Sequence, residues 1–389
     1  MNRYAAASGV SLLAAALAAL WLALTRSPFA AMDLRIWLGY GAAGFLAAGV
    51  GLEIVRSGAY APPHRFSQVY LWSAIAGIAL LSLPPSGRVA GLHRLGWLGF
   101  VVSAVDYAYL IWWRPPMPAK QPEAFGDVLV PGKQLRRSDP VRDGVARAMV
   151  AAGPAYLFLV AVAGIVTGNV LGSRSELLLL FGWLSSLSLG GALYIWPRLL
   201  AHPAGSRHLA RWGAALWHLG LVLSVITLRT WLLGLTGLGA LLLLADLAPT
   251  LRGVRRGRPY VVGSRRRYPK VGARIGFVLA ALLLLALSLS PLLPQGVLAW
   301  QRILSIAFAV AANLTLLHHL RPVFGAQFLR ARGGWMPSLL ALSTLGLGAF
   351  PTEFAAAAAV ASIYLAASWL PGLPLRPQKQ EERRTRRPV

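Results

Sequence analysis

Residues 231–250 read WLLGLTGLGALLLLADLAPT, and this almost uninterrupted apolar run decides the fold class. A run of about 20 apolar residues is long enough to cross the hydrocarbon core of a bilayer as an α-helix. Backbone groups in lipid must be hydrogen-bonded internally, and the run is too continuously apolar for a barrel strand. Similar runs recur along the chain, so we predict about twelve transmembrane helices: 5–25, 34–55, 67–83, 92–113, 146–170, 175–197, 209–229, 231–250, 272–293, 297–319, 335–351 and 353–370.

The composition of the chain is that of an integral membrane protein. Of its 389 residues, 57% are apolar and 13% charged, and the mean hydropathy is +0.60. Soluble domains have about 45–50% apolar and about 25% charged residues. Such hydrophobicity also excludes intrinsic disorder. The chain has no cysteine, which excludes disulfides, cysteine-ligated metal sites and thiol catalysis.

The distribution of basic residues predicts the orientation in the membrane. The chain carries 38 Lys and Arg residues against 12 Asp and Glu, a net charge of +26. With both termini in the cytoplasm, 31 of the 38 fall in cytoplasmic segments and 7 on the other side, as the positive-inside rule requires. We therefore predict an all-α, polytopic, N-in/C-in bundle. The arginine-rich, cysteine-free composition favours a bacterial cytoplasmic (inner) membrane, with anionic lipids rather than nucleic acid at the basic face.

Two long basic segments divide this single membrane domain, 1–389, into three blocks of four helices. The segments are 1–113 (helices 1–4), the basic cytoplasmic loop 114–145, 146–250 (helices 5–8), the basic cytoplasmic loop 251–271, 272–370 (helices 9–12) and the charged cytoplasmic tail 371–389. In each block a Pro- and Arg-bearing segment with a nearby histidine joins the second and third helices, which we interpret as a weak threefold repeat. Alternatively, short cytoplasmic loops of this composition simply look alike.

One segment of the middle block is similar to a known family. Residues 190–221 read GGALYIWPRLLAHPAGSRHLARWGAALWHLGL and resemble a helix–loop–helix segment of heme-copper oxidase subunit I, cbb3-type oxidases and related nitric oxide reductases included. The matching positions are Gly191, Tyr194, Pro197, Arg198, Leu199, Ser206, Leu209, Ala210, Trp212, Trp217 and His218. The resemblance implies twelve helices, N-in/C-in topology and a pseudo-threefold 4+4+4 arrangement. The NnrS-like proteins of nitric oxide response share this general appearance.

The histidines depart from the oxidase pattern. The family needs six ligand histidines for two hemes and a copper, whereas this chain has seven histidines in all: His64, His93, His202, His208, His218, His318 and His319. On the predicted topology only His218 lies deep in the bilayer, and helices two and six contain none. We therefore expect no complete binuclear centre and no metal-ion site, and heme is the one candidate cofactor.

Three ionisable residues inside the predicted helices are candidate functional residues, because such groups are costly in a membrane. His218 is either a heme ligand, through neutral Nε2, or a structural histidine bonded to a neighbouring helix. Asp106 and Asp246 lie toward the cytoplasmic ends of helices four and eight. Each is either a relay carboxylate for a proton or cation, or a structural group paired with an arginine or capping a helix. Arg302 either extends to the interface or faces an acid. No catalytic residue is predicted.

Two functions of different classes remain open from the sequence. The first is an accessory, assembly or one-heme component of respiratory or nitrogen-oxide metabolism, with oxidase or nitric oxide reductase subunits as partners. The second is a secondary transporter in which Asp106 and Asp246 couple a substrate to protons or cations. A pure scaffold would differ from both in showing neither heme absorption nor transport.

Overall fold

The computed structural model is helical almost throughout, and its helices coincide with the predicted apolar runs. The residues that it describes are 2–56, 64–83, 90–112, 140–167, 173–200, 205–227, 229–252, 260–262, 265–267, 271–292, 298–320 and 335–369. Within them, each predicted run is occupied by one helix or by one rod of consecutive helical segments. The predicted all-helical fold class is therefore confirmed for the described part of the chain, with one small exception.

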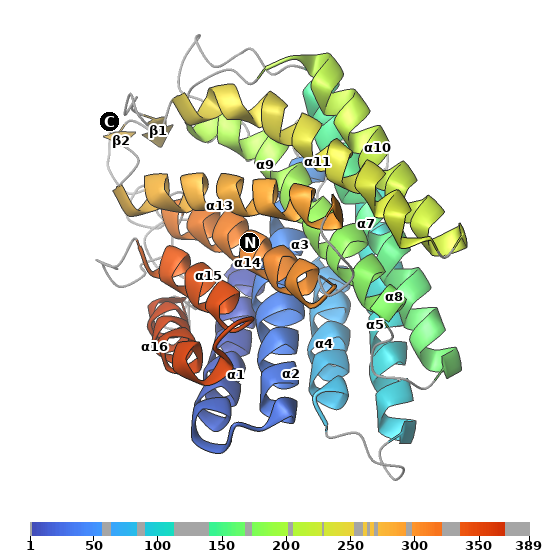
Figure 1. Cartoon of the computed structure of the whole chain (residues 1–389), viewed down its shortest axis with the longest axis vertical. Helices are drawn as coiled ribbons and strands as arrows, with labels where there is room; N and C mark the ends of the chain where they lie inside the picture. Colours follow the sequence, from blue (N-terminus) through green and yellow to red (C-terminus); the bar gives the residue numbers. More distant parts are fainter. Residues whose placement is uncertain are drawn as a thin grey trace, which may run out of the picture.

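The elements follow the predicted block order (Figure 1). Those of the first block are α1 (Asn2–Thr25), α2 (Pro28–Ile36), η1 (Trp37–Ala43), α3 (Gly44–Arg56), α4 (His64–Leu81) and α5 (Ala90–Trp112). Those of the second are α7 (Pro140–Thr167), α8 (Ser173–Leu177), η2 (Leu178–Ser185), α9 (Ser186–Leu199), α10 (Arg207–Thr227), η3 (Thr230–Leu232), α11 (Leu233–Leu247) and η4 (Ala248–Leu251). Those of the third are α13 (Val271–Leu289), η5 (Ser290–Leu292), α14 (Leu298–Leu320), α15 (Met336–Gly346) and α16 (Pro351–Trp369). Helices α2, α7 and α16 begin with proline, which is favourable at this position because the first helical N–H has no partner in any case.

The exception is a short β-hairpin in the segment 251–271, which the sequence analysis treats as a loop. Strands β1 (Tyr260–Val262) and β2 (Arg265–Arg267) pair in antiparallel fashion, with Tyr260 opposite Arg267. Gly263 and Ser264 separate the strands in sequence, and this two-residue spacing is a hairpin signal. The hairpin lies outside the helical bundle and changes nothing in the block order.

Six helices of the described residues are long and apolar enough to cross a membrane, which makes this a membrane protein. They are Ala6–Thr25, Gly91–Trp112, Val141–Thr167, Ser175–Pro197, Arg207–Thr227 and Leu233–Leu251. The other apolar helices are shorter or interrupted. Helix α15, for example, has 11 residues, about 17 Å at 1.5 Å per residue.

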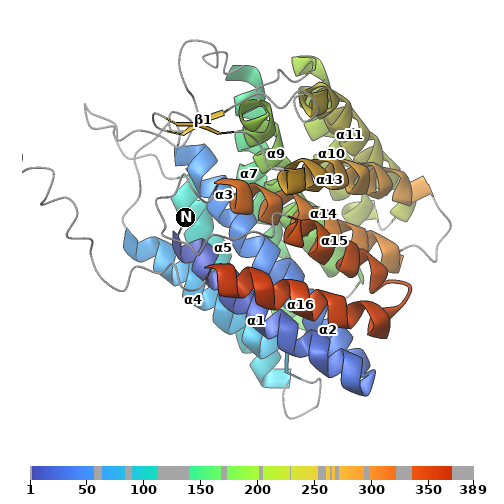
Figure 2. The same ribbon diagram turned by 90° about the vertical axis from the view of Figure 1, so that its left-hand side faces the viewer.

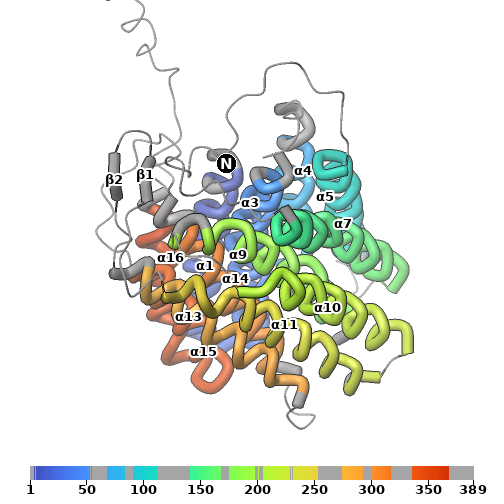
Figure 3. The backbone as a smooth tube through the Cα atoms, turned by 90° about the horizontal axis from the view of Figure 1, so that it is seen from above, coloured from blue at the N-terminus to red at the C-terminus, as the bar shows by residue number. Residues whose placement is uncertain are grey.

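The three blocks contact one another in a cycle. The last helix of each block packs on the first helix of the next: α5 on α7, α11 on α13, and α16 on α1, the last pair lying side by side in Figure 2. The second rod of each block lies inside, and these three central rods (α2–η1–α3, α8–η2–α9 and α14) contact one another. Seen from above in Figure 3, α9 and α14 lie near the middle, between α5 and α7 on one side and α11 and α13 on the other. In Ser175–Pro197, 94% of the residues are buried, against 39–56% in the other five long helices.

Two of the central rods contain π-helical segments, η1 and η2, and these pack closely on their neighbours. Gly44, at the end of η1, lies against the Trp183 indole of η2, so that a Cβ at this position would clash with the ring. Gly39 of η1 faces Ile306 of α14. The π-helix is rare in proteins and frequently occurs at functional sites. The interior between these rods is therefore a place to look for function.

Candidate functional sites

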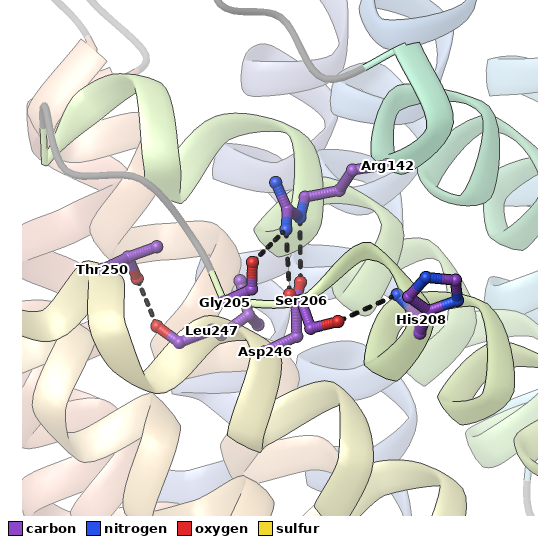
Figure 4. Close-up of polar contacts among 7 residues, drawn as sticks. All are labelled: Arg142, Gly205, Ser206, His208, Asp246, Leu247 and Thr250. Atoms are coloured by element: carbon purple, nitrogen blue, oxygen red, sulfur yellow. Dashed lines mark hydrogen bonds and ion pairs between the residues drawn. The ribbon is translucent and has the colours of Figure 1, made fainter.

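Asp246 forms a bidentate ion pair with Arg142 at one end of the bundle (Figure 4). Arg142 Nε donates to Asp246 Oδ2 and Arg142 Nη2 donates to Oδ1, both at 2.9 Å. The same Nη2 donates to the carbonyl of Gly205 at 3.3 Å, and the N–H of Gly205 donates to the Asp246 carbonyl at 2.7 Å. Asp246 is fully buried and Arg142 is 8% exposed. The pair therefore joins α7 and α11 to the segment between α9 and α10.

The surroundings of this pair are also hydrogen-bonded. Ser206 precedes α10, and its hydroxyl accepts the backbone N–H of His208 at 3.3 Å (Figure 4). The Thr250 hydroxyl donates to the carbonyl of Leu247 at 2.6 Å, at the end of α11. Of the two alternatives for Asp246, this geometry favours the structural pair with an interior arginine. Arg142 was assigned to the basic loop 114–145 by the sequence analysis, but it lies in the first turn of α7.

Asp106 contacts a different part of the bundle. Its Oδ2 accepts the backbone N–H of Tyr70 at 3.1 Å, which links α5 to α4. The Tyr70 ring lies between the rings of Tyr4 and Tyr107, at centroid distances of 5.9 and 5.0 Å. Asp106 is 8% exposed. The structure therefore places Asp106 and Asp246 in separate contacts, each against neighbouring protein groups, and not in one site.

His218 lies between α10 and α7. Its Nδ1 is 2.8 Å from the hydroxyl of Tyr156, and the two rings stack at a centroid distance of 5.7 Å with an interplanar angle of 15°. Its Nε2 is buried and has no hydrogen-bond partner among the described residues. Both predicted alternatives thus have a structural basis: the Tyr156 bond suits a structural histidine, and the unpartnered Nε2 suits a ligand.

The remaining histidines give no metal site in the described residues. The side chain of His93 is 2% exposed, and its Nε2 donates to the carbonyl of Leu83 at 2.9 Å, a structural contact. His208 is exposed at the start of α10. The side chains of the other four lie outside the described residues: His64, His202, His318 and His319. Among the residues that the structure describes, no three His, Asp or Glu side chains are grouped so that they could hold a metal ion.

A second ion pair, between Glu176 and Arg302, lies at the opposite end of the central rods. Arg302 Nε of α14 is 2.8 Å from Glu176 Oε2 of α8, and the side chains are 23% and 11% exposed. Facing an acid was one of the two alternatives for Arg302, but sequence reasoning did not single out Glu176. The signal was present: Glu176 is the only acidic residue between Asp143 and Asp246. Its position at the start of an apolar run made it look like an ordinary interfacial residue.

Comparisons with known proteins assign no family to the chain. No protein-family model matches it, and no curated protein and no solved structure is significantly similar to it.

Proposed function

We propose that the chain crosses a bacterial inner membrane twelve times, with both termini in the cytoplasm, as three quasi-equivalent four-helix arcs. The cyclic contacts of the blocks support this arrangement, because α5–α7, α11–α13 and α16–α1 are equivalent contacts under a threefold relation. The three inner rods are likewise the second rods of their blocks. The 31-to-7 distribution of basic residues supports the orientation.

On this scaffold we propose an accessory, assembly or one-heme role in respiratory or nitrogen-oxide metabolism, similar in architecture to heme-copper oxidase subunit I. The observation that carries the proposal is the inner position of the three second rods, together with the side chains that fill them. Two of these rods contain no histidine, and bulky apolar groups such as Phe45, Trp183 and Phe308 are buried in them. A scaffold of this kind keeps the arrangement while lacking the ligands of a binuclear centre.

The residues around His218 fit the one-heme version of this proposal. A heme-ligating histidine binds iron through one ring nitrogen while the other is hydrogen-bonded, which fixes the tautomer. Here Nε2 has no partner and Nδ1 faces the Tyr156 hydroxyl at 2.8 Å. His218 would therefore hold the iron and Tyr156 would orient the imidazole by accepting the Nδ1 proton. Heme would supply redox or gas-binding chemistry at this position.

Absorption spectroscopy of the purified protein tests the one-heme version. We expect a Soret band from the wild-type protein that is lost in His218→Ala and kept in His208→Ala. His208 is a matched control because it lies on the same helix but is exposed. In Tyr156→Phe the band should remain and shift, since the ring loses its orienting bond. A colourless wild-type protein, or an unchanged band in His218→Ala, contradicts a heme at this position.

The accessory role has its own test. We expect deletion of the gene in its own bacterium to lower the amount of assembled terminal oxidase or nitric oxide reductase, and His208→Ala to restore it fully. Heme staining of membrane subunits and respiratory rates would measure this. Normal levels and rates of these enzymes in the deletion strain would contradict the accessory and assembly roles.

A secondary transporter is the alternative, and the buried ion pairs favour it. Arg142–Asp246 and Glu176–Arg302 lie near opposite ends of the rod α8–η2–α9, and charged pairs in membrane segments commonly line transport pathways. If Asp106 and Asp246 couple transport to protons or cations, Asp106→Asn with Asp246→Asn should abolish uptake into proteoliposomes. Uptake that survives both substitutions contradicts this coupling.

A further inference from the structure

The Glu176–Arg302 cluster is unusual for its unpartnered polar atoms. Arg302 Nε lies 2.8 Å from Glu176 Oε2, yet the direction of its N–H does not make a hydrogen bond, and it is counted among the buried polar atoms without a partner. Gln301, beside it on α14, is 5% exposed, and its Oε1 has no partner. The Ser305 hydroxyl, one turn further, is fully buried and also unpartnered. Most buried polar atoms in proteins are hydrogen-bonded, so that a group of exceptions calls for a reason.

Similar atoms continue along η2, which packs on the same face of α14. Trp183 Nε1 and the Ser185 hydroxyl are unpartnered, in side chains that are 2% and 0% exposed. Both residues lie within about three helical turns of Glu176 along the same rod. The Trp183 ring in turn lies 6.5 Å from the ring of Tyr40 in the π-helical segment η1. The central rods thus hold a set of unpaired hydrogen-bonding groups that extends inward from the ion pair.

The charges of this cluster favour an anion over a cation. Arg35 of α2 lies close enough to Glu176 to stabilise its charge, as Arg302 does. Two guanidinium groups therefore surround one carboxylate, which leaves an excess of one positive charge. The unpartnered groups include N–H donors, Arg302 Nε and Trp183 Nε1, and hydroxyls that can donate. Arginine binds planar, paired oxygens particularly well, because its donors form a rigid fork.

We propose that the Glu176–Arg302 cluster binds a small planar monovalent oxyanion, of the carboxylate, nitrite or nitrate class, between Arg302 and Arg35. Gln301 and Ser305 supply further polar contacts, and Glu176 competes with the anion for the guanidinium groups. This inference does not depend on the heme proposal or on the accessory role. It predicts opposite effects for the two members of the ion pair, because Arg302 attracts the anion and Glu176 repels it.

The test uses the full-length protein in detergent, with sodium nitrate and sodium acetate as probes and sodium sulfate at equal ionic strength as reference. We expect the melting temperature, followed by tryptophan fluorescence, to rise saturably with nitrate or acetate beyond the sulfate reference, as binding to the native state requires. Arg302→Gln should lose the saturable rise. Arg94→Gln, which removes an exposed arginine elsewhere, should keep it. No saturable rise in the wild-type protein, or an equal rise in Arg302→Gln, overturns the proposal.

Glu176→Gln keeps the proposal testable if Arg302→Gln does not fold. Removing the competing carboxylate should tighten nitrate binding about tenfold, the scale of one hydrogen bond to a charged group. If the pair were only a structural contact, nitrate affinity would stay unchanged or fall in Glu176→Gln, and either result overturns the proposal.

Discussion

The two buried ion pairs of this protein lie near opposite ends of the rod α8–η2–α9, about 35 Å apart along it, and they differ in how completely they are hydrogen-bonded. Arg142 and Asp246 meet through two bonds of 2.9 Å, with a backbone carbonyl as a third acceptor. Glu176 and Arg302 approach through one atom pair at 2.8 Å, and the Arg302 Nε proton has no hydrogen-bond acceptor among the described residues.

This difference separates a structural contact from a candidate binding site. A bidentate, fully buried pair has little capacity left for a ligand, and its loss strands a charge. A one-point pair beside unpartnered donors can exchange partners at small cost. Burial of charge in a membrane protein therefore indicates function only after the hydrogen bonds of each charge have been counted.

The largest expected effect is at the structural pair. Asp246→Ala leaves Arg142 buried without a counter-charge and should lower the free energy of unfolding by about 3–5 kcal/mol. The double variant Arg142→Met with Asp246→Leu should recover most of that loss, since no charge is then stranded. Unfolding in detergent with a graded denaturant would measure both. A loss below about 1 kcal/mol in Asp246→Ala would show that the pair is not structural.

The next effect concerns helix packing near the two ends. A Cβ on Gly239 of α11 would lie 2.5 Å from the backbone nitrogen of Trp217 on α10, so Gly239→Ala must push two backbones apart. We expect a loss of about 1–3 kcal/mol. Gly44→Ala meets the edge of the Trp183 ring, which can move, and should be less destabilising. Equal losses in the two variants would mean that the central rods pack as rigidly as α10 and α11.

A smaller effect is expected at the open pair. Arg302 is 23% exposed, so that water can solvate it when its partner is removed, and Glu176→Gln should change stability by about 1 kcal/mol or less. The same unfolding assay measures this variant without added nitrate. A loss as large as that of Asp246→Ala would remove the distinction between the two pairs.

The smallest effect is expected midway between the pairs. Asn313 Nδ2 donates to the Ser188 hydroxyl at 2.8 Å and links α14 to α9. Hydrogen bonds between membrane helices average about 0.6 kcal/mol, so Ser188→Ala should cost about that much. A loss above about 2 kcal/mol would exceed the range for such bonds and would show that this bond holds the central rods together.

The helices could be predicted from the sequence because each is a continuous apolar run, and 231–250 illustrates how little else is needed. Asp246 could be flagged because a carboxylate in such a run is costly. Its partner could not, since Arg142 lies 104 residues away in sequence and the basic residues around it obscured it. The π-helical segments η1 and η2 left no signal in residue types, because their i→i+5 bonds depend on packing between the central rods.

The central claim is that the chain crosses the membrane twelve times with its basic segments on the side of both termini. Because the chain has no cysteine, single substitutions can be labelled in intact cells without background. We predict that Ser264→Cys, in the basic segment 251–271, reacts with a membrane-impermeant maleimide only after the cells are opened, whereas Arg229→Cys, between α10 and α11, reacts in intact cells. Labelling of Ser264→Cys from outside intact cells would contradict the topology and the threefold arrangement built on it.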